Sequence, residues 1–104
     1  MTRMFGLRAE WADDHGCRLH IAGELDVGTA PELRRAIGEL MAGGARTVVV
    51  DLEKTAFMDS SGLGALLWAE HRLEAIGGSL AAVHPRKEIA DVLALAGADG
   101  LVST

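Results

Sequence analysis

A short run of β-branched residues, Thr-Val-Val-Val at positions 47–50, most limits what this chain can fold into. Consecutive valines without polar alternation are typical of a strand that is covered on both faces within a parallel sheet. Parallel strands cannot be joined by a tight hairpin, so a longer connection that contains a helix is expected beside this strand. The run therefore predicts an α/β fold with this strand near the centre of the sheet.

Helical patterns lie on both sides of that run. Residues 29–32, Thr-Ala-Pro-Glu, match a capping box with Thr29 as the N-cap. The apolar residues that follow recur at helical spacing as far as Gly43-Gly44, a pair that predicts the end of the helix. A second helix is expected to start near Ser60 and to end at Gly77-Gly78. Its apolar stripe contains Leu63, Leu66, Leu67, Ala69, Leu73 and Ile76.

The remaining segments complete a mixed sheet. Residues 5–21 alternate apolar and polar side chains around a short turn, which predicts a β-hairpin with one buried face. Residues 80–83 predict another buried strand, a third helix is expected to open at Pro85, and residues 101–102 suit a short edge strand. The predicted order is β-β-α-β-α-β-α, with an optional last β, in one domain that spans residues 1–104.

The charge balance and the cysteine content limit the classes of partner. With 10 Lys+Arg against 15 Asp+Glu, the formal net charge is -5, which argues against direct nucleic-acid binding because that binding depends on clustered cations. Cys17 has no second cysteine for an internal disulfide, and no stretch resembles a secretory signal or a membrane span. These features predict a cytoplasmic protein whose partners are other proteins.

A stretch rich in small polar residues stands where the second helix is expected to begin. Residues 52–58 are expected to connect the central strand to this helix, with Leu52 and Phe57 packed inward. Residues 57–64, Phe-Met-Asp-Ser-Ser-Gly-Leu-Gly, then combine a carboxylate, two hydroxyls and two glycines. A helix start favours negative charge, so a phosphate on either serine would be tolerated there. On residue types alone, the simplest interpretation is that one serine caps the helix and the other has no role.

No catalytic or ligand-binding motif is complete in this stretch. The hydrolase elbow G-x-S-x-G fails for both Ser60 and Ser61, because Met58 and Asp59 stand where its first glycine is required. Residues 62–64, Gly-Leu-Gly, lack the last glycine of a dinucleotide motif, and no P-loop lysine is present. The four histidines and the cysteine lack the paired spacing of metal ligands. The sequence therefore predicts no enzyme activity, no cofactor and no metal site.

Two motifs together resemble the anti-sigma factor antagonists, which are single-domain bacterial members of the STAS family. The first is Gly23-Glu24-Leu25-Asp26, followed by Thr29-Ala30 and a helix, and the second is the stretch 57–64. They stand in the family's order, with a hairpin before the first and a β-α pair after the second. The resemblance covers nearly the whole chain, and it implies a STAS-like mixed β-sheet with an N-terminal β-hairpin and helices packed on the sheet.

The resemblance also implies a role in transcription regulation, in settings such as the stress response or sporulation. Such proteins bind an anti-sigma factor that has serine kinase activity, are released when it phosphorylates them, and are reset by a protein phosphatase. The phosphorylated residue is expected to be Ser61, with Ser60 as the alternative. The implied partner-binding residues are Glu24, Asp26, Asp59, Ser60, Ser61, Gly62 and Leu63.

Two other functions stay open at this point. One is a STAS module that does not switch and that docks into a lipid-transport or signalling complex, with the serine position kept as a helix start. The other is a small serine hydrolase, which the incomplete elbow motif makes the least favoured interpretation. The sequence also leaves open whether the protein forms a homodimer.

Overall fold

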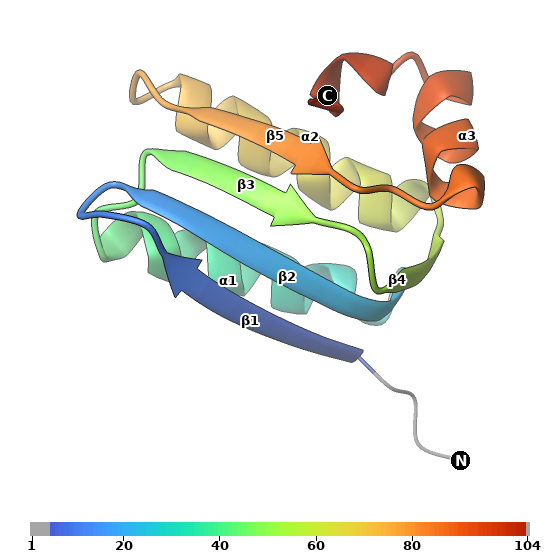
Figure 1. Cartoon of the computed structure of the whole chain (residues 1–104), viewed down its shortest axis with the longest axis horizontal. Coiled ribbons are helices and arrows are strands. Elements are labelled where there is room, and N and C mark those ends of the chain that lie inside the picture. Colours follow the sequence, from blue (N-terminus) through green and yellow to red (C-terminus); the bar gives the residue numbers. More distant parts are fainter. Residues whose placement is uncertain (1–4, 104) are drawn as a thin grey trace.

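Strand β2 (Gly16–Leu25) organises the sheet, because three other strands pair with it. The computed structural model describes residues 5–103. Strand β1 (Phe5–Trp11) runs antiparallel to β2 and forms the predicted hairpin with it. Strands β3 (Thr47–Asp51) and β4 (Thr55–Met58) both run parallel to β2, one after the other along the same side (Figure 1).

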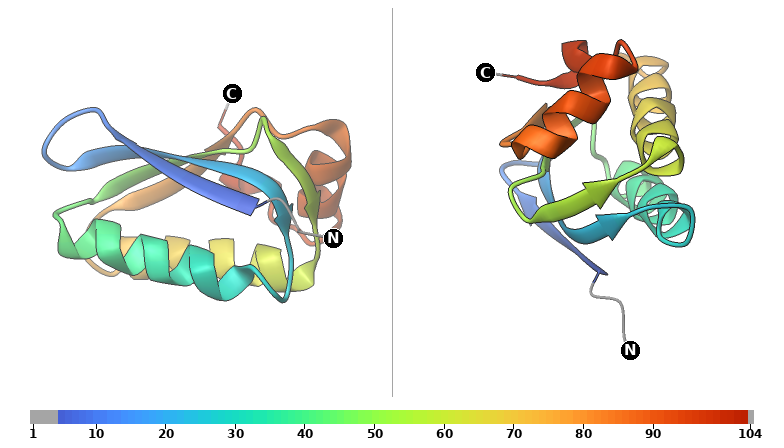
Figure 2. Two further views of the ribbon diagram at one scale, coloured as in Figure 1. Left: turned by 90° about the horizontal axis from the view of Figure 1, so that it is seen from below. Right: turned by 90° about the vertical axis from the view of Figure 1, so that its right-hand side faces the viewer.

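The other elements surround this group of strands. Strand β5 (Ser79–Val83) pairs with β3 and completes a five-stranded mixed sheet. Helices α1 (Ala30–Ala42) and α2 (Ser60–Glu74) lie side by side along one face of the sheet (Figure 2). Helix α3 (Lys87–Leu95) contacts β4, and a 3-10 helix, η1 (Asp99–Leu101), contacts β5 and α3. The α/β prediction is confirmed, with one strand more than expected.

The hydrophobic core is built by the sheet, the helices α1, α2 and α3, and the 3-10 helix η1. Alternate side chains of β2 point into it and meet the apolar stripes of α1 and α2. Ile76 was expected on the second stripe but lies beyond the end of α2 and is 43% exposed. Fully buried members of the core include Leu19, Ile21, Leu25, Leu33, Ile37, Leu66 and Leu73.

The opposite face of the sheet is more polar and more open. Val48 and Val50 are buried on the side of α1 and α2, whereas Val49 is only partly buried. On the neighbouring strand, Arg18 and His20 alternate with the core residues and are also partly buried. The expectation that strand 47–50 is covered on both faces is therefore wrong, because the helices α1 and α2 cover one face of it.

Strand β4 replaces the connection that was expected at residues 52–58. It pairs with the end of β2 after a register shift between Gly23 and Glu24, where Gly23 has a φ of 94° that suits glycine. The buried Thr55 hydroxyl donates a hydrogen bond to the Ile21 carbonyl at 2.7 Å. Within β4, Phe57 is 47% exposed, so its expected inward packing is wrong.

Two smaller expectations also need correction. Thr29 stands at the N-cap position of α1, but its hydroxyl does not cap the helix. The hydroxyl instead donates to the Glu24 carbonyl at 2.7 Å and accepts from the Asp26 N–H at 2.9 Å. Near the C-terminus, the expected edge strand is reduced to one bridge between Val102 and Ala82 that follows η1.

Candidate functional site

The first turn of α2 is joined directly to the end of β2. The backbone N–H of Asp59 donates to the Leu25 carbonyl at 3.3 Å, and Leu25 pairs in register with Met58. The Asp59 side chain accepts a hydrogen bond from the Gly62 N–H at 3.0 Å. Asp59 is therefore the N-cap of α2, and the interpretation that a serine caps this helix is wrong.

Ser60 and Ser61 are the first two residues of α2. Ser60 is exposed and Ser61 is partly buried. Because Asp59 caps the helix, neither serine hydroxyl is needed for that purpose, and no group within residues 5–103 forms a hydrogen bond with either hydroxyl. Both hydroxyls lie at the positive end of the helix dipole, where an added phosphate is electrostatically tolerated.

The two glycines in this turn have different surroundings. A Cβ added to Gly62 would overlap the Leu25 carbonyl oxygen and would lie 2.8 Å from the Leu25 Cγ atom. Gly62 is therefore required for the contact between α2 and β2. A Cβ added to Gly64 would meet no atom within 4 Å. Of the two glycines, only Gly64 therefore leaves open space beside the helix. The side chain of Leu63, which stands between the two glycines in the sequence, is buried in the core.

The loop after β2 is held by Asp26. The side chain of Asp26 is buried and accepts hydrogen bonds from the Gly28 N–H at 2.9 Å and the Thr29 N–H at 3.2 Å. Its backbone carbonyl accepts from the Ala30 N–H at 2.7 Å, at the start of α1. Asp26 thus fixes the shape of the loop, whereas Glu24 is exposed.

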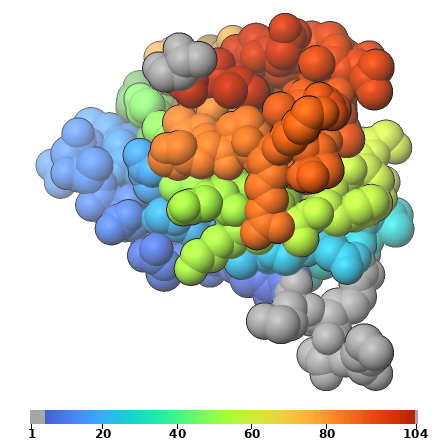
Figure 3. Space-filling model, turned by 45° about the vertical axis from the view of Figure 1, so that its right-hand side comes forward, coloured from blue at the N-terminus to red at the C-terminus, as the bar shows by residue number. Residues whose placement is uncertain are grey.

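Two exposed apolar side chains, which the sequence analysis did not identify as functional residues, lie at this end of the molecule. Phe57 is paired in register with Glu24, and Val27, at the tip of the loop after β2, is 73% exposed. Figure 3 shows the yellow-green residues of β4 and the start of α2 beside the cyan residues that follow β2. We call the exposed residues Glu24, Val27, Phe57, Ser60 and the partly buried Ser61 the switch face.

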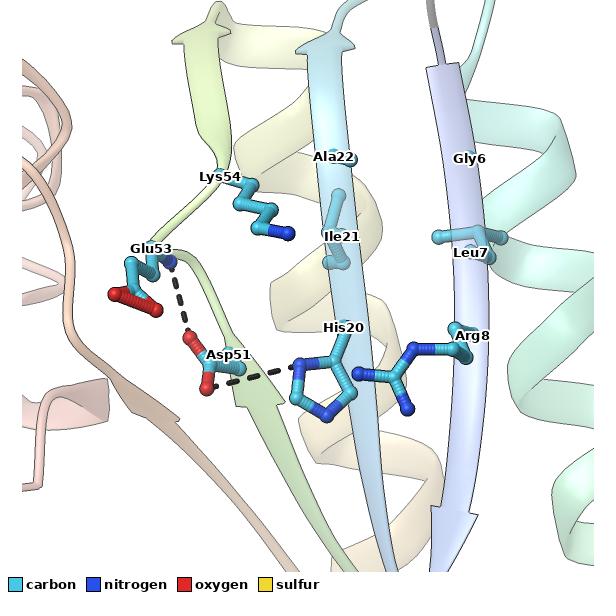
Figure 4. Close-up of a pocket in the computed structure, with 9 residues that line it drawn as sticks. All are labelled: Gly6, Leu7, Arg8, His20, Ile21, Ala22, Asp51, Glu53 and Lys54. Atoms are coloured by element: carbon cyan, nitrogen blue, oxygen red, sulfur yellow. Dashed lines mark hydrogen bonds and ion pairs between the residues drawn. The ribbon is translucent and has the colours of Figure 1, made fainter.

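A second polar group lies on the open face of the sheet. The carboxylate of Asp51 is 3.0 Å from Arg18, 3.4 Å from His84 and 3.8 Å from His20, and it accepts a hydrogen bond from the Glu53 N–H at 3.0 Å. A cavity of about 380 Å³ lies beside it (Figure 4). Among residues 5–103, no group of three or more His, Cys, Asp or Glu side chains is arranged to hold a metal ion.

These neighbours determine the pKa of Asp51. Burial alone would raise the pKa, but the hydrogen bonds from Glu53 and Arg18 and the nearby His84 outweigh it and hold the pKa below the ordinary 3.8. The folded state therefore favours the charged carboxylate. Because the folded pKa is depressed, the stability that Asp51 contributes is present above pH 3.8 and is lost as the pH falls through the folded value.

The pH dependence of stability in an Asp51→Asn variant tests the interaction between the charges of Asp51 and Arg18. Above pH 3.8 the variant should unfold at a lower urea concentration than the wild type, because a charge-assisted hydrogen bond to Arg18 is lost. Below that pH the difference should shrink, since the wild-type carboxylate becomes protonated. Urea unfolding of both proteins at pH values above and below 3.8 measures this difference in stability. A difference that stays the same in acid would contradict the lowered pKa of Asp51.

No helix within residues 5–103 has both the length and the apolar character that crossing a membrane requires.

The family model described as "Mlab, STAS domain" matches residues 9–103. The anti-sigma F factor antagonist of Lysinibacillus sphaericus is 31% identical over 80 residues, which are 76% of this chain and 68% of that protein. The anti-sigma-B factor antagonist of Staphylococcus aureus (strain NCTC 8325 / PS 47) is 46% identical over 44 residues, which are 42% of this chain and only 41% of that protein.

Solved structures extend the similarity to the fold. The unphosphorylated form of the anti-sigma factor antagonist SpoIIAA has a TM-score of 0.85 and 25% identity, and the match covers 94% of this chain and 86% of that one. The phosphorylated form of Bacillus SpoIIAA has a TM-score of 0.76 with 25% identity, over 94% of this chain and 89% of that one. By sequence and by fold, the chain belongs to the STAS domain family.

Proposed function

We propose that this protein is an anti-sigma factor antagonist that regulates transcription by partner switching. It binds an anti-sigma factor with serine kinase activity, is released when Ser61 is phosphorylated, and is reset by a protein phosphatase. It acts in the cytoplasm as one STAS domain and as a regulator without enzyme activity of its own. The names of the relatives and the match to SpoIIAA in both phosphorylation states support this function.

One observation carries the proposal that a serine of this turn is the phosphorylated residue. Asp59 supplies the cap of α2, so the serine hydroxyls play no part in capping the helix. A phosphate adds about -1.5 to -2 charge at neutral pH, and at a helix N-terminus it need not unfold the helix. We assign the phosphate to Ser61 from the resemblance of the Asp-Ser-Ser-Gly motif to the family, with Ser60 as the alternative.

Release of the partner then follows from electrostatics at the switch face. Phe57 and Val27 offer apolar area for docking, and Ser61 lies in the turn that β4 leads into. A partner surface fitted to a neutral hydroxyl has to desolvate the phosphate dianion when it rebinds, and that costs affinity. Asp59, whose side chain caps the same turn, adds like charge. The protein therefore needs no large conformational change to let its partner go.

A STAS module that docks without switching is the second candidate. The description of the matching family model, "Mlab, STAS domain", does not name an anti-sigma factor antagonist. The match to the staphylococcal antagonist covers only 41% of that protein. In that case the Asp59 cap and the switch face would serve as a constant docking surface, in a lipid-transport or signalling complex. A serine hydrolase is a weaker third candidate, which covalent labelling by a phosphonylating probe would reveal.

A binding experiment with ATP separates the candidates. Purified anti-sigma kinases are immobilised one at a time, and the protein is bound and then washed with ATP or with a non-hydrolysable analogue. Partner switching predicts that ATP releases the protein and that the analogue does not. A kinase complex that keeps the phosphorylated protein would contradict the proposal. Stable docking without phosphate transfer from any kinase of the panel to this protein would favour the second candidate.

A further inference from the structure

Strand β1 has an open edge along its whole length. Within residues 5–103, β2 is its one strand neighbour, and β1 forms the lower edge of the sheet in Figure 1. An edge strand presents unpaired N–H and C=O groups, which can pair with a strand of another chain. The seven residues Phe5–Trp11 are long enough for such a pairing to add a continuous ladder.

The hydrogen bonds of the hairpin show which backbone groups of β1 point outward. The Ala12 N–H donates to the Gly16 carbonyl at 2.9 Å, across the hairpin. Hydrogen-bonded and non-hydrogen-bonded residue pairs alternate along an antiparallel ladder. The backbone N–H and C=O groups of Glu10 and Arg8 therefore also face β2. The backbone N–H and C=O groups of Leu7, Ala9 and Trp11 face the open edge instead. On the other side of β2, the Gly23 N–H donates to the Lys54 carbonyl, which agrees with this alternation.

We infer that a second copy of this chain pairs with β1 in antiparallel orientation, with the twofold axis at Ala9. This register places Arg8 of each copy opposite Glu10 of the other, and Leu7 opposite Trp11. Outward-facing backbone groups then meet outward-facing groups along the whole pairing. Two neighbouring registers also pair the outward-facing backbone groups of the two copies, but they place Arg8 opposite Arg8 or Glu10 opposite Glu10. Like charges directly opposite each other destabilise a sheet, so these registers are disfavoured.

Trp11 supplies apolar area for this interface. Its side chain is 44% exposed, on the side of the sheet that carries α1, where a Cβ added to Gly43 would lie 3.6 Å from the Trp11 ring. In an antiparallel edge pairing the twofold axis is perpendicular to the sheet, so the α1 and α2 helices of both copies lie on the same face. Each Trp11 ring then covers Leu7 of the other copy, which is partly buried already.

The inferred interface lies on the other side of β2 from β4 and Ser61. Strands β1 and β4 pair with β2 on opposite sides, and α2 begins after β4. Pairing through β1 therefore does not use Ser61, and the inference stands whether or not Ser61 is phosphorylated.

Charge exchange across the interface tests the register. Wild-type protein should show a mass in sedimentation equilibrium that rises with concentration toward twice the 10.9 kDa of one chain. Arg8→Glu and Glu10→Arg should each raise the dimer dissociation constant about tenfold, because each creates two like-charge pairs by symmetry. The double variant should restore the wild-type constant. Mixing the two single variants should give a heterodimer that is tighter than either homodimer.

A proline variant tests the role of the edge itself. Ala9→Pro removes an N–H that points away from β2, so the ladder within one chain is kept and the pairing between chains is lost. The variant should be monomeric, with a near-wild-type circular dichroism spectrum. The inference is overturned if wild-type protein keeps the mass of one chain at its highest soluble concentration. It is equally overturned if the single charge variants dimerise as the wild type does, or if their mixture forms no heterodimer.

Discussion

Replacing Ser61 by aspartate is expected to weaken binding to the anti-sigma factor by about tenfold to hundredfold, which corresponds to about 1.4–2.8 kcal/mol. Ser61 lies in the first turn of α2, where the variant carboxylate adds charge beside the capping Asp59. A partner fitted to a neutral hydroxyl has to desolvate this charge without a matching cation. Isothermal titration calorimetry with the purified partner measures the dissociation constant.

Two control variants isolate the charge and its position. Ser61→Ala removes the hydroxyl without adding charge and should bind within a few-fold of the wild type. Ser60→Asp places the same charge on the neighbouring exposed residue, and it should weaken binding less if Ser61 is the residue that the partner covers. If Ser61→Asp binds as tightly as Ser61→Ala, charge is not the cause of release.

Replacing Gly62 by alanine is expected to lower the free energy of unfolding by about 2–4 kcal/mol. The added Cβ would overlap the carbonyl oxygen of Leu25, which belongs to the backbone of β2 and accepts the Asp59 N–H. Neither group can move without disturbing the joint between the strand and the helix. Urea unfolding followed by circular dichroism measures the effect.

Gly64 provides a matched control for that experiment. It lies in the same helix, two residues further on, and a Cβ added there meets no atom within 4 Å. Gly64→Ala should therefore stabilise the protein, by up to about 1 kcal/mol, because alanine favours the helix more than glycine does. If both variants change stability equally, the contact between Gly62 and Leu25 does not limit substitution.

The order of the elements could be predicted from the sequence because it depends on local patterns. The hairpin at 5–21, the stripes of α1 and α2 and the apolar run at 47–50 each follow from the spacing of side chains. Strand β4 could not be predicted in the same way. It is four residues long, and its pairing depends on a register shift at Gly23, far away in the sequence. The exposure of Phe57 follows from that pairing.

The candidate site was predictable in composition but not in the role of each residue. The sequence motifs contain Asp26, Asp59 and both serines, and the fold joins the two motifs through the Leu25 carbonyl. Either Asp59 or a serine has the right chemistry for a helix cap, so residue type alone could not choose between them. Asp26 gave no local sign that it holds its loop through buried hydrogen bonds.

The histidines near Asp51 were missed for a different reason. His20 comes from β2, Asp51 from β3 and His84 from the end of β5, so no fixed sequence spacing joins them. The parallel register places His20 directly opposite Asp51, and this register is a property of the assembled sheet. Sequence spacing can detect only those groups whose members lie on one helix, strand or turn.

Intact-mass spectrometry after incubation with the anti-sigma kinase and ATP tests the phosphorylation of Ser61 most directly. We expect one phosphate on the wild type and on Ser60→Ala, none on Ser61→Ala, and release from the kinase that proceeds in step with phosphate incorporation. Peptide mapping should place the phosphate on Ser61. Phosphate that persists on Ser61→Ala, or a fully phosphorylated protein that stays bound to the kinase, would contradict the proposed switch.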